Sequence, residues 1–493
     1  DSIRSIQVLA KAKQRNLGFT LEELFRHQTI EELAAARAGR TGEPPTPRTE
    51  PLSLLSADDR ARLPAEVEDA YPLVDLQAGM LFHSALSPQT AVYHDVFSSR
   101  IKTAWDEARL AEALKRVMRQ HAVLRTSFAL AGFSRPLQLV YHEARVPLGV
   151  EDVRDLEAGE QEEQLSGWLE AEKQRPFSWS EPPLFRLQVH RLSDESFQLS
   201  LSFHHAILDG WSVAMFLAEL FQQYAALGGA AVRVPDRPGL SYRDFVALES
   251  AAVESAQTAQ YWEQLVGPSV RTLLPRLPHP EGVRRRGPGP GTLGVKQVAL
   301  SESLSAELKA LARQAGVPLK SLLLAAHVRV LGLVSGQAEV LTGLVSNSRP
   351  EEADGERVLG LFLNTVPFRL RLQEESWESL VSRVFQAERD GLPHRRYPAG
   401  RLQRRGAPSG AGSGEVLYET AFNYNHFHVY QGLEGQSEIE VSGPRVFEYT
   451  NFTLMTNFDL DPQSGGLTLR LNYDTGQIEA VQAEWLSGYY VRC

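Results

Sequence analysis

The chain has 493 residues, enough to form two or three compact units around large hydrophobic cores. Its formal net charge of −10, from 51 Lys and Arg residues against 61 Asp and Glu residues, argues against a general nucleic-acid binder. No stretch is long and apolar enough to span a membrane and no signal peptide opens the chain, so we expect no membrane partner. The single cysteine, Cys493, excludes an intrachain disulfide and fits a cytoplasmic location.

Residues 1–38 carry helix-spaced apolar side chains but are too few to form an independent core. Ser2 stands at the predicted start of the first helix, where free backbone N–H groups and the helix dipole favour a bound anion. With its Asp1-Ser2-Ile3 opening and residues 25–34 (FRHQTIEELA), the segment resembles the C-terminal part of a peptidyl carrier protein. The resemblance implies a covalent 4'-phosphopantetheine cofactor on Ser2. The alternative is that Ser2 only caps the helix.

Residues 39–65 are predicted to form a linker, because Gly and Pro residues are dense among charged ones. Within it, a short helix is expected at residues 56–60, with Ser56 as its N-cap. Two further stretches, residues 282–294 and 403–414, are rich in Arg, Gly, Pro and Ser and are expected to be loops.

The most informative stretch is residues 203–212 (FHHAILDGWS). Residues 197–203 before it alternate between apolar and polar, which predicts a strand with one buried face. Residues 213–227 after it are mostly apolar and lack Gly and Pro, which predicts a buried helix. His204, His205, Asp209 and Gly210 therefore lie where a strand turns toward a helix, a common place for functional side chains. The residue types alone leave open that Asp209 is only an N-cap and that both histidines are ordinary polar residues.

The complete string HHxxxDG followed by Trp-Ser resembles the signature of the condensation domains of nonribosomal peptide synthetases. Other segments resemble further motifs of that family in the family's order, from Tyr71 to the C-terminus. Where the family usually has Ser-Gly-Arg-Pro, this chain has Asn347-Ser348-Arg349-Pro350, which puts the backbone turn in doubt because Ser resists positive φ. The matching segments are residues 71–83, 121–128, 240–245, 260–262, 345–350, 360–367, 397–398 and 418–425.

The resemblance implies an α/β (α+β) fold of two lobes, each like chloramphenicol acetyltransferase, arranged in a V behind a partial helical carrier domain. We place the N-lobe at residues 66–240 and the C-lobe at residues 241–493. In the family the His motif lies at the floor of a tunnel between the lobes, and carriers dock at opposite mouths. An arginine pairs with the motif's aspartate, and Arg125 is our candidate partner of Asp209, because a guanidinium fork can hold a buried carboxylate rigidly.

The implied enzyme is an amide-forming acyltransferase in which a carrier-bound acceptor amine attacks the upstream donor thioester. An α-amine has a pKa near ~8, so a base helps but is not obligatory. His205 is expected to remove the proton or to hold the amine at attack distance, and the sequence leaves both roles open. His204 is expected to pack the loop and Asp209 to fix its geometry, while Gly210 lets the backbone pass close to the reacting centre. No metal is expected.

Two other functions belong to related domains of this fold: an epimerization domain, which shares the His motif, and a non-catalytic carrier-docking domain, in which the motif is degraded. We favour condensation because epimerization domains usually have a Trp after the Ser, whereas here Trp211 precedes Ser212, and because the His motif is intact. Gly79-Met80-Leu81-Phe82-His83 resembles the subtype that takes a D-configured donor and an L-configured acceptor. The expected partners are an upstream adenylation domain and a downstream acceptor carrier, in the biosynthesis of a secondary metabolite such as a siderophore or antibiotic.

Overall fold

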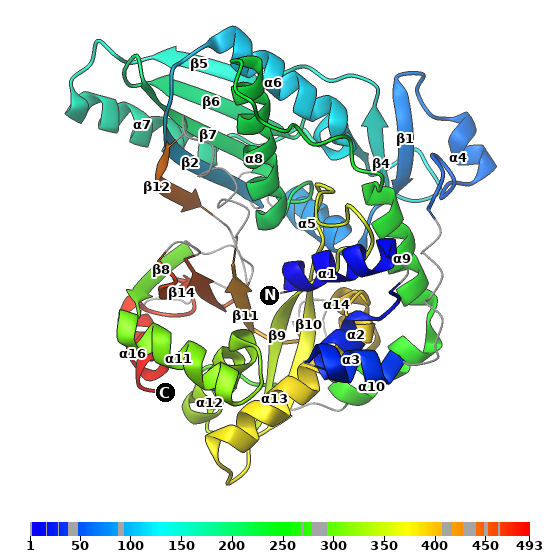
Figure 1. Cartoon of the computed structure of the whole chain (residues 1–493), viewed down its shortest axis with the longest axis vertical. Helices are drawn as coiled ribbons and strands as arrows, with labels where there is room; N and C mark the ends of the chain where they lie inside the picture. Colours follow the sequence, from blue (N-terminus) through cyan, green and yellow to red (C-terminus); the bar gives the residue numbers. More distant parts are fainter. Residues whose placement is uncertain are drawn as a thin grey trace.

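The computed structural model describes residues 2–15, 17–27, 29–37, 48–86, 93–267, 271–277, 293–406, 417–426, 440–447, 452–461 and 464–493. Within them, two large sheets occupy the upper and lower parts of the molecule as drawn, and helices cover each sheet (Figure 1). Residues 39–47 of the predicted linker and most of both predicted loops lie outside the described residues. Residues 403–406, predicted as loop, instead continue a helix.

The first lobe is built on a five-stranded sheet in the order β12-β2-β7-β6-β5, flanked by a three-stranded antiparallel sheet in the order β1-β4-β3. The β5–β6 pair is parallel, and the other pairs of the larger sheet are antiparallel. The strands are β1 (Val67–Pro72), β2 (His94–Lys102), β3 (Thr126–Ala129), β4 (Leu137–Tyr141), β5 (Leu148–Asp152), β6 (Phe185–Arg191), β7 (Ser196–His204) and β12 (Glu440–Phe447). The helices are α5 (Asp75–Leu86), α6 (Glu107–Gln120), η1 (Ala122–Arg125), α7 (Ala158–Lys173) and α8 (Gly210–Leu227).

Strand β7 confirms the strand predicted before the His motif, but both of its faces are buried rather than one. Its polar face is covered by α7, whose Glu172 accepts a hydrogen bond from Ser202 Oγ at 2.6 Å. Ser200 and Gln198 hydrogen-bond to Ser98 on β2 at 2.7 and 2.8 Å. Buried polar side chains are tolerated where they find partners, so an alternating pattern did not reveal the covering helix.

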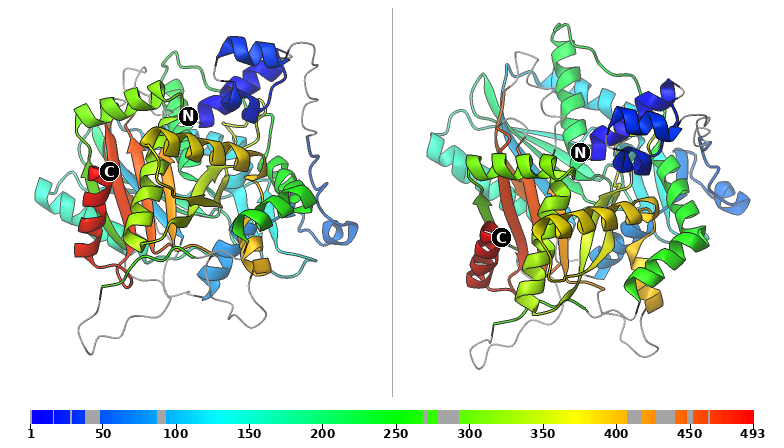
Figure 2. Two further views of the ribbon diagram at one scale, coloured as in Figure 1. Left: turned by 90° about the horizontal axis from the view of Figure 1, so that it is seen from below. Right: turned by 60° about the horizontal axis from the view of Figure 1, so that its bottom comes forward.

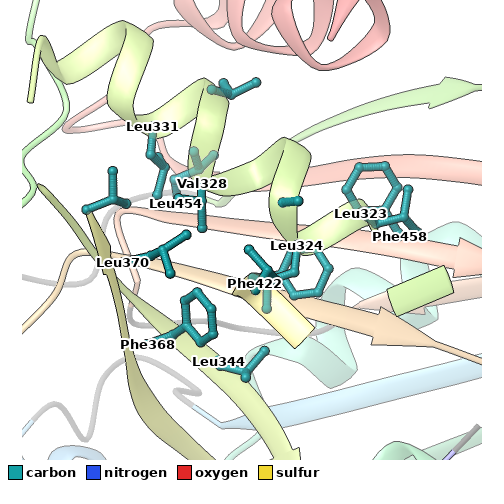
Figure 3. Close-up of a cluster of buried hydrophobic side chains, with 14 of the residues drawn as sticks. Leu323, Leu324, Val328, Leu331, Leu344, Phe368, Leu370, Phe422, Leu454 and Phe458 are labelled. Atoms are coloured by element: carbon teal, nitrogen blue, oxygen red, sulfur yellow. The ribbon is translucent and has the colours of Figure 1, made fainter. Parts of the chain in front are cut away.

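The second lobe is a six-stranded sheet in the order β10-β9-β11-β13-β14-β8, and α12 packs on it. Its strands are β8 (Leu293–Ala299), β9 (Glu339–Asn347), β10 (Leu363–Arg371), β11 (Thr420–Asn425), β13 (Leu454–Leu460) and β14 (Leu467–Asp474). Its helices are α9 (Tyr242–Glu254), α10 (Ala256–Val266), α11 (Glu302–Gln314), α12 (Leu319–Ser335), α13 (Trp377–Gly391), η2 (Leu392–His394), α14 (Ala399–Gly406) and α16 (Ala480–Arg492). Figure 3 shows Leu324 and Val328 of α12 meeting Phe422 and Leu370 of the sheet.

Strand β12 connects the two lobes. It belongs to the C-terminal half of the chain, which we predicted to lie wholly in the second lobe, yet it pairs antiparallel with β2 of the first lobe. Strand β2 in turn pairs with β7, whose last residue is His204. Hydrogen bonding to a sheet edge is a tertiary event, and nothing in the local pattern of residues 440–447 distinguishes one lobe's edge from the other's. The predicted lobe boundaries themselves stay predictions.

Residues 2–37 form three helices, α1 (Ser2–Gln14), α2 (Leu21–Arg26) and α3 (Ile30–Arg37), which lie together on one side of the molecule (Figure 2). Helix α2 carries a capping box between Thr20 and Glu23. Past the linker, α4 (Ala57–Ala61) has Ser56 as its N-cap, as predicted. Helix α1 does not stand apart from the lobes, because its Ile6 packs against Trp211 at the start of α8.

Among the described residues, no single helix is long and apolar enough to cross a membrane. Helices α11 and α12 meet the length and hydropathy requirement only when joined, and they meet at an angle of 106°. Helix α12 is the buried helix of the second lobe's core, which accounts for its apolar sequence.

Candidate active site

The His motif forms a short loop between β7 and α8, and three backbone hydrogen bonds hold it. The His205 N–H donates to the Tyr93 carbonyl at 2.7 Å, and the Ile207 N–H donates to the His204 carbonyl at 3.0 Å. The Asp209 N–H donates to the Gly360 carbonyl of the second lobe at 3.0 Å. Gly210 is the first residue of α8. The loop is therefore fixed from the first lobe at one end and from the second lobe at the other.

His205 is the more exposed of the two histidines, with 20% of its side chain accessible. Its Nδ1 lies 2.8 Å from Oδ2 of Asp95, a buried residue on β2. Because Nδ1 faces the carboxylate, Nε2 lies on the opposite side of the ring. Sequence reasoning missed Asp95, which lies far upstream of the His motif and in no matching segment. The signal that could have found it is an acid within the strand-forming residues 94–97.

His204 is buried, at 3% exposure, and both of its ring nitrogens have a hydrogen-bond partner. Nδ1 accepts a hydrogen bond from the Ala206 N–H at 3.2 Å, and Nε2 lies 3.4 Å from Ser84 Oγ on α5. Burial, reinforced by the neighbouring His205, lowers the pKa of His204 to about 3. The ring is therefore neutral at physiological pH, with its proton on Nε2, and it packs the loop against α5.

Asp209 is the N-cap of α8, and its carboxylate is held almost entirely by groups from elsewhere in the fold. Oδ1 accepts the Ser212 N–H at 2.7 Å, the ordinary capping bond. Arg349 Nη2 donates to both carboxylate oxygens, at 3.0 and 3.3 Å, and the Phe362 N–H donates to Oδ2 at 3.1 Å. Asp209 and Arg349 are both buried, and we call this ion pair the latch. It ties the His loop of the first lobe to residues 348–362 of the second lobe.

Arg349 is fully buried and makes contacts beyond the latch. Its Nη2 also donates to Ser212 Oγ at 2.7 Å, and its guanidinium lies 4.1 Å from the centre of the Phe362 ring. Burial lowers the pKa of Arg349, and the negative charge of Asp209 opposes that shift. A guanidinium with several partners at this depth holds its position rigidly, so the latch is a fixed element.

Two further arginines hold the backbone that carries Arg349. Arg395 Nε donates to the Asn347 carbonyl at 3.1 Å, and Arg396 Nε donates to the Ser348 carbonyl at 3.1 Å. Both guanidiniums pair with Glu351. Although burial alone would raise the pKa of Glu351, the charges of these two arginines lower it to about 2. Ser348 does not take a positive φ, so its substitution for the family's glycine causes no backbone strain here.

The prediction that Arg125 pairs with Asp209 is wrong. Arg125 is buried at the end of η1, where it donates to the Met118 carbonyl at 3.0 Å and to the His142 carbonyl at 3.1 Å. Its charge is paired with Glu68 at 2.8 Å. The N–H groups of Arg125 thus donate to carbonyls at the ends of α6 and β4. The carboxylate of Asp209 instead accepts a hydrogen bond from an arginine of the second lobe. The true partner is Arg349. It lies in the segment Asn347-Ser348-Arg349-Pro350, for which we considered only the conformation of the backbone turn.

Ser2 begins α1, as predicted, while Asp1 and the side chain of Ser2 lie outside the described part of the chain. Across the described residues, no group of three or more His, Cys, Asp or Glu side chains is placed to hold a metal ion. The structure thus brings His204, His205, Asp209 and Gly210 together at one loop and leaves Arg125 in another part of the first lobe.

The condensation domain family matches residues 67–492. The chain belongs to the condensation domain family. It is 37% identical, over 99% of its length, to the AMB antimetabolite synthetase AmbE of Pseudomonas aeruginosa, and 30% identical, over 88%, to one of the linear gramicidin synthase proteins of Brevibacillus parabrevis. It spans only 23% and 8% of those two proteins. The match to peptide synthetases makes this condensation domain an amide-forming acyltransferase by family.

A solved condensation domain, from the monacolin K polyketide synthase MokA, superposes with a TM-score of 0.72 at 18% identity, covering 87% of this chain and 97% of that one. At this identity the likeness concerns the fold alone. It confirms the predicted mixed α/β architecture of the condensation domain.

The latch predicts strong energetic coupling between Asp209 and Arg349. Asp209→Ala or Arg349→Ala alone should lower the free energy of unfolding by about 3–5 kcal/mol, because each leaves a buried charge without its partner. Removing both should cost clearly less than the sum, and chemical denaturation of the single and double variants measures the difference.

The control cycle pairs Asp209→Ala with Arg125→Ala. These two residues share no hydrogen-bond partner among the described contacts, so their effects should add within about 0.5 kcal/mol. Coupling between Asp209 and Arg125 as large as that between Asp209 and Arg349 would contradict the assignment of the latch.

Proposed function

We propose that the chain forms a peptide bond between two carrier-bound substrates, and that His205 acts at the reacting centre. The acceptor α-amine attacks the donor thioester carbonyl, a C–N bond forms, the C–S bond breaks, and the amine's proton ends on the departing thiolate. The observation that carries the proposal is the placement of His205: it is partly exposed on a loop that both lobes hold, with a buried carboxylate at its Nδ1.

Asp95 sets the chemistry available to His205. A carboxylate beside Nδ1 favours the tautomer that carries its proton there, which leaves a lone pair on Nε2. That lone pair can accept the amine's proton as the bond forms, or accept a hydrogen bond that holds the amine in place. We assign His205 both parts, with Asp95 as its positioning residue.

The remaining motif residues support the loop. His204 is neutral and packed, Asp209 is committed to the latch, and Gly210 starts α8, so none of the three presents a second base to a substrate. The proposed substrate path is a tunnel between the lobes with a carrier at each mouth. Epimerization and non-catalytic docking are the rival functions, and the intact pairing of His205 with Asp95 favours chemistry over docking.

We also propose that residues 2–37 are the end of a peptidyl carrier domain and that Ser2 bears a phosphopantetheine arm. Helix α1 starts at Ser2 and has no acidic residue in its first turn, so its N–H groups and dipole fit a phosphodiester. Bound there, the arm supplies the thioester on which the donor travels. An upstream adenylation domain and a downstream acceptor carrier are the proposed partners, and the cytoplasm the proposed location.

The proposed donor ends in glycine or in a directly loaded D-residue, and the proposed acceptor is an L-residue. Residues 79–83 resemble the D-donor subtype, yet only the linker separates the proposed carrier from the condensation domain, so no epimerization domain lies between them. Glycine resolves this conflict, because a site that rejects L side chains by steric clash has nothing to clash with in glycine.

The test of the proposed function is single-turnover amide formation with both carriers chemically loaded. His205→Ala should lower the rate by about 10²–10⁴-fold, the usual contribution of a positioned acid–base group. His204→Ala should act mainly through stability, which thermal unfolding reports. A folded His205→Ala protein with a near-native rate would rule out the assigned role, and absence of amide product from the unaltered chain would favour docking or epimerization.

Attachment of the arm is tested by intact mass. A phosphopantetheinyl transferase and coenzyme A should add one arm to a chain extended upstream to a complete carrier domain, and Ser2→Ala should abolish the addition. Ser5→Ala, one turn along the same helix, is the matched control and should still be loaded. Loading of the Ser2→Ala variant would show that the site lies elsewhere.

Donor selection is tested in the same amide-forming assay, with peptides ending in Gly, D-Ala or L-Ala and a single acceptor. Glycine and D-Ala should react at comparable rates and L-Ala at least about tenfold more slowly, since one misplaced methyl group costs about 1–3 kcal/mol. Equal rates for L-Ala would refute the subtype inferred from residues 79–83.

A further inference from the structure

Helix α1 docks on the surface that surrounds the latch. Its Ile6 is almost completely buried, at 1% exposure, although the helices of residues 2–37 are too short to form a core of their own. The side chains that cover it are Trp211 and Met215, one turn apart at the start of α8. Ile6 therefore owes its burial to the first lobe and not to the helical segment that contains it.

The other end of α1 contacts the second lobe. Lys13 Nζ lies 2.6 Å from Glu352 Oε1, and both side chains are partly buried. Helix α2 extends the contact, because it packs against α13 of the same lobe. Helix α1 thus touches both lobes at once, and Figure 1 shows it lying between the parts of the chain that form them.

The residues that α1 touches belong to the two elements that the latch joins. Trp211 follows Asp209 by two residues, and its indole Nε1–H donates to the Glu356 carbonyl at 2.8 Å. Glu352 follows Arg349 by three residues, and its neighbour Glu351 anchors Arg395 and Arg396. The segment 348–362 and the start of α8 are therefore held together by the latch from inside and by α1 from outside.

We propose that the docking of α1 and the closure of the latch are energetically coupled. Any parting of α8 from residues 348–362 breaks the Asp209–Arg349 pair and also separates the two surfaces that α1 spans. Docking of α1 therefore stabilises the closed latch and, through it, the loop that presents His205. The coupling is reciprocal, so weakening the latch must also loosen α1. The proposed coupling depends only on the contacts that residues 2–14 make with the two lobes. It does not require a phosphopantetheine arm on Ser2.

Hydrogen exchange on the intact chain tests the proposal without any substrate. Ile6→Asp should speed exchange across α1 by about tenfold or more, since it replaces a buried aliphatic side chain by a charge. The amides that report the latch, those of Gly360 and Phe362, should speed up with it. Gly360 donates its N–H group to Ser212 Oγ and Phe362 donates its N–H group to Asp209, both across the boundary between the lobes, so both are released when the latch opens.

A charge series provides a gentler perturbation that leaves the core untouched. Lys13→Glu should speed exchange of both α1 and the latch amides by about twofold to fivefold, as expected for a partly exposed ion pair, and adding Glu352→Lys should reverse the effect. Lys11→Glu is the matched control, with the same charge change at an exposed position of the same helix, and should change neither.

Each outcome decides between the alternatives. If exchange becomes faster in α1 and in the latch amides together, the coupling is supported. The reciprocal test is Arg349→Lys, which weakens the latch and should speed exchange in α1. Faster exchange in α1 with unchanged latch amides overturns the coupling. Unchanged exchange in α1 after Ile6→Asp overturns the docking itself. None of these readouts depends on amide formation or on loading of Ser2, so failure here is distinguishable from failure of the proposed function.

Discussion

The buried ion pair between Asp209 and Arg349 is the constraint on which the geometry of the site depends. The two residues are 140 positions apart in the chain and in different lobes, and neither is accessible to water. Burying two charges is costly unless their mutual attraction and additional hydrogen bonds compensate. Here the compensation comes from Ser212 and Phe362, which supply further N–H donors to the carboxylate. The pair is therefore stable only in one arrangement of the lobes, and that arrangement fixes the His loop.

A second connection between the two halves of the chain is made by strand β12. Strand β12 belongs to the second half of the chain but pairs with β2 at the edge of the first lobe's sheet. The same strand β2 carries Asp95 and pairs with β7, which ends at His204. The latch and the added strand thus connect the reacting region to the second half of the chain at two separate points. Small shifts between the lobes are resisted at both points, and this rigidity is what a positioned amine needs for attack.

The two histidines illustrate how environment divides identical side chains into different roles. His204 is enclosed, its pKa is lowered to about 3, and it behaves as a neutral packing group. His205 keeps contact with solvent and faces a carboxylate. A base must be both accessible and oriented, and only the second residue meets both conditions. The two roles differ because His204 is the last residue of β7 and His205 is the first residue of the loop that follows.

The sequence by itself determined the strand and the helix that flank the His motif and the loop that joins them, and it offered the N-cap at Asp209 as one interpretation; the mixed α/β class came from the family resemblance. The strand, the helix and the cap depend on periodicity and on capping chemistry, which act over a few residues. The tertiary structure alone decided that Arg349 and not Arg125 meets Asp209, that Asp95 stands behind His205, that β12 joins the other lobe and that Ile6 is buried by Trp211. An arginine's local sequence does not reveal which buried carboxylate it will reach, because that choice is made by the packing of segments that are distant in the chain.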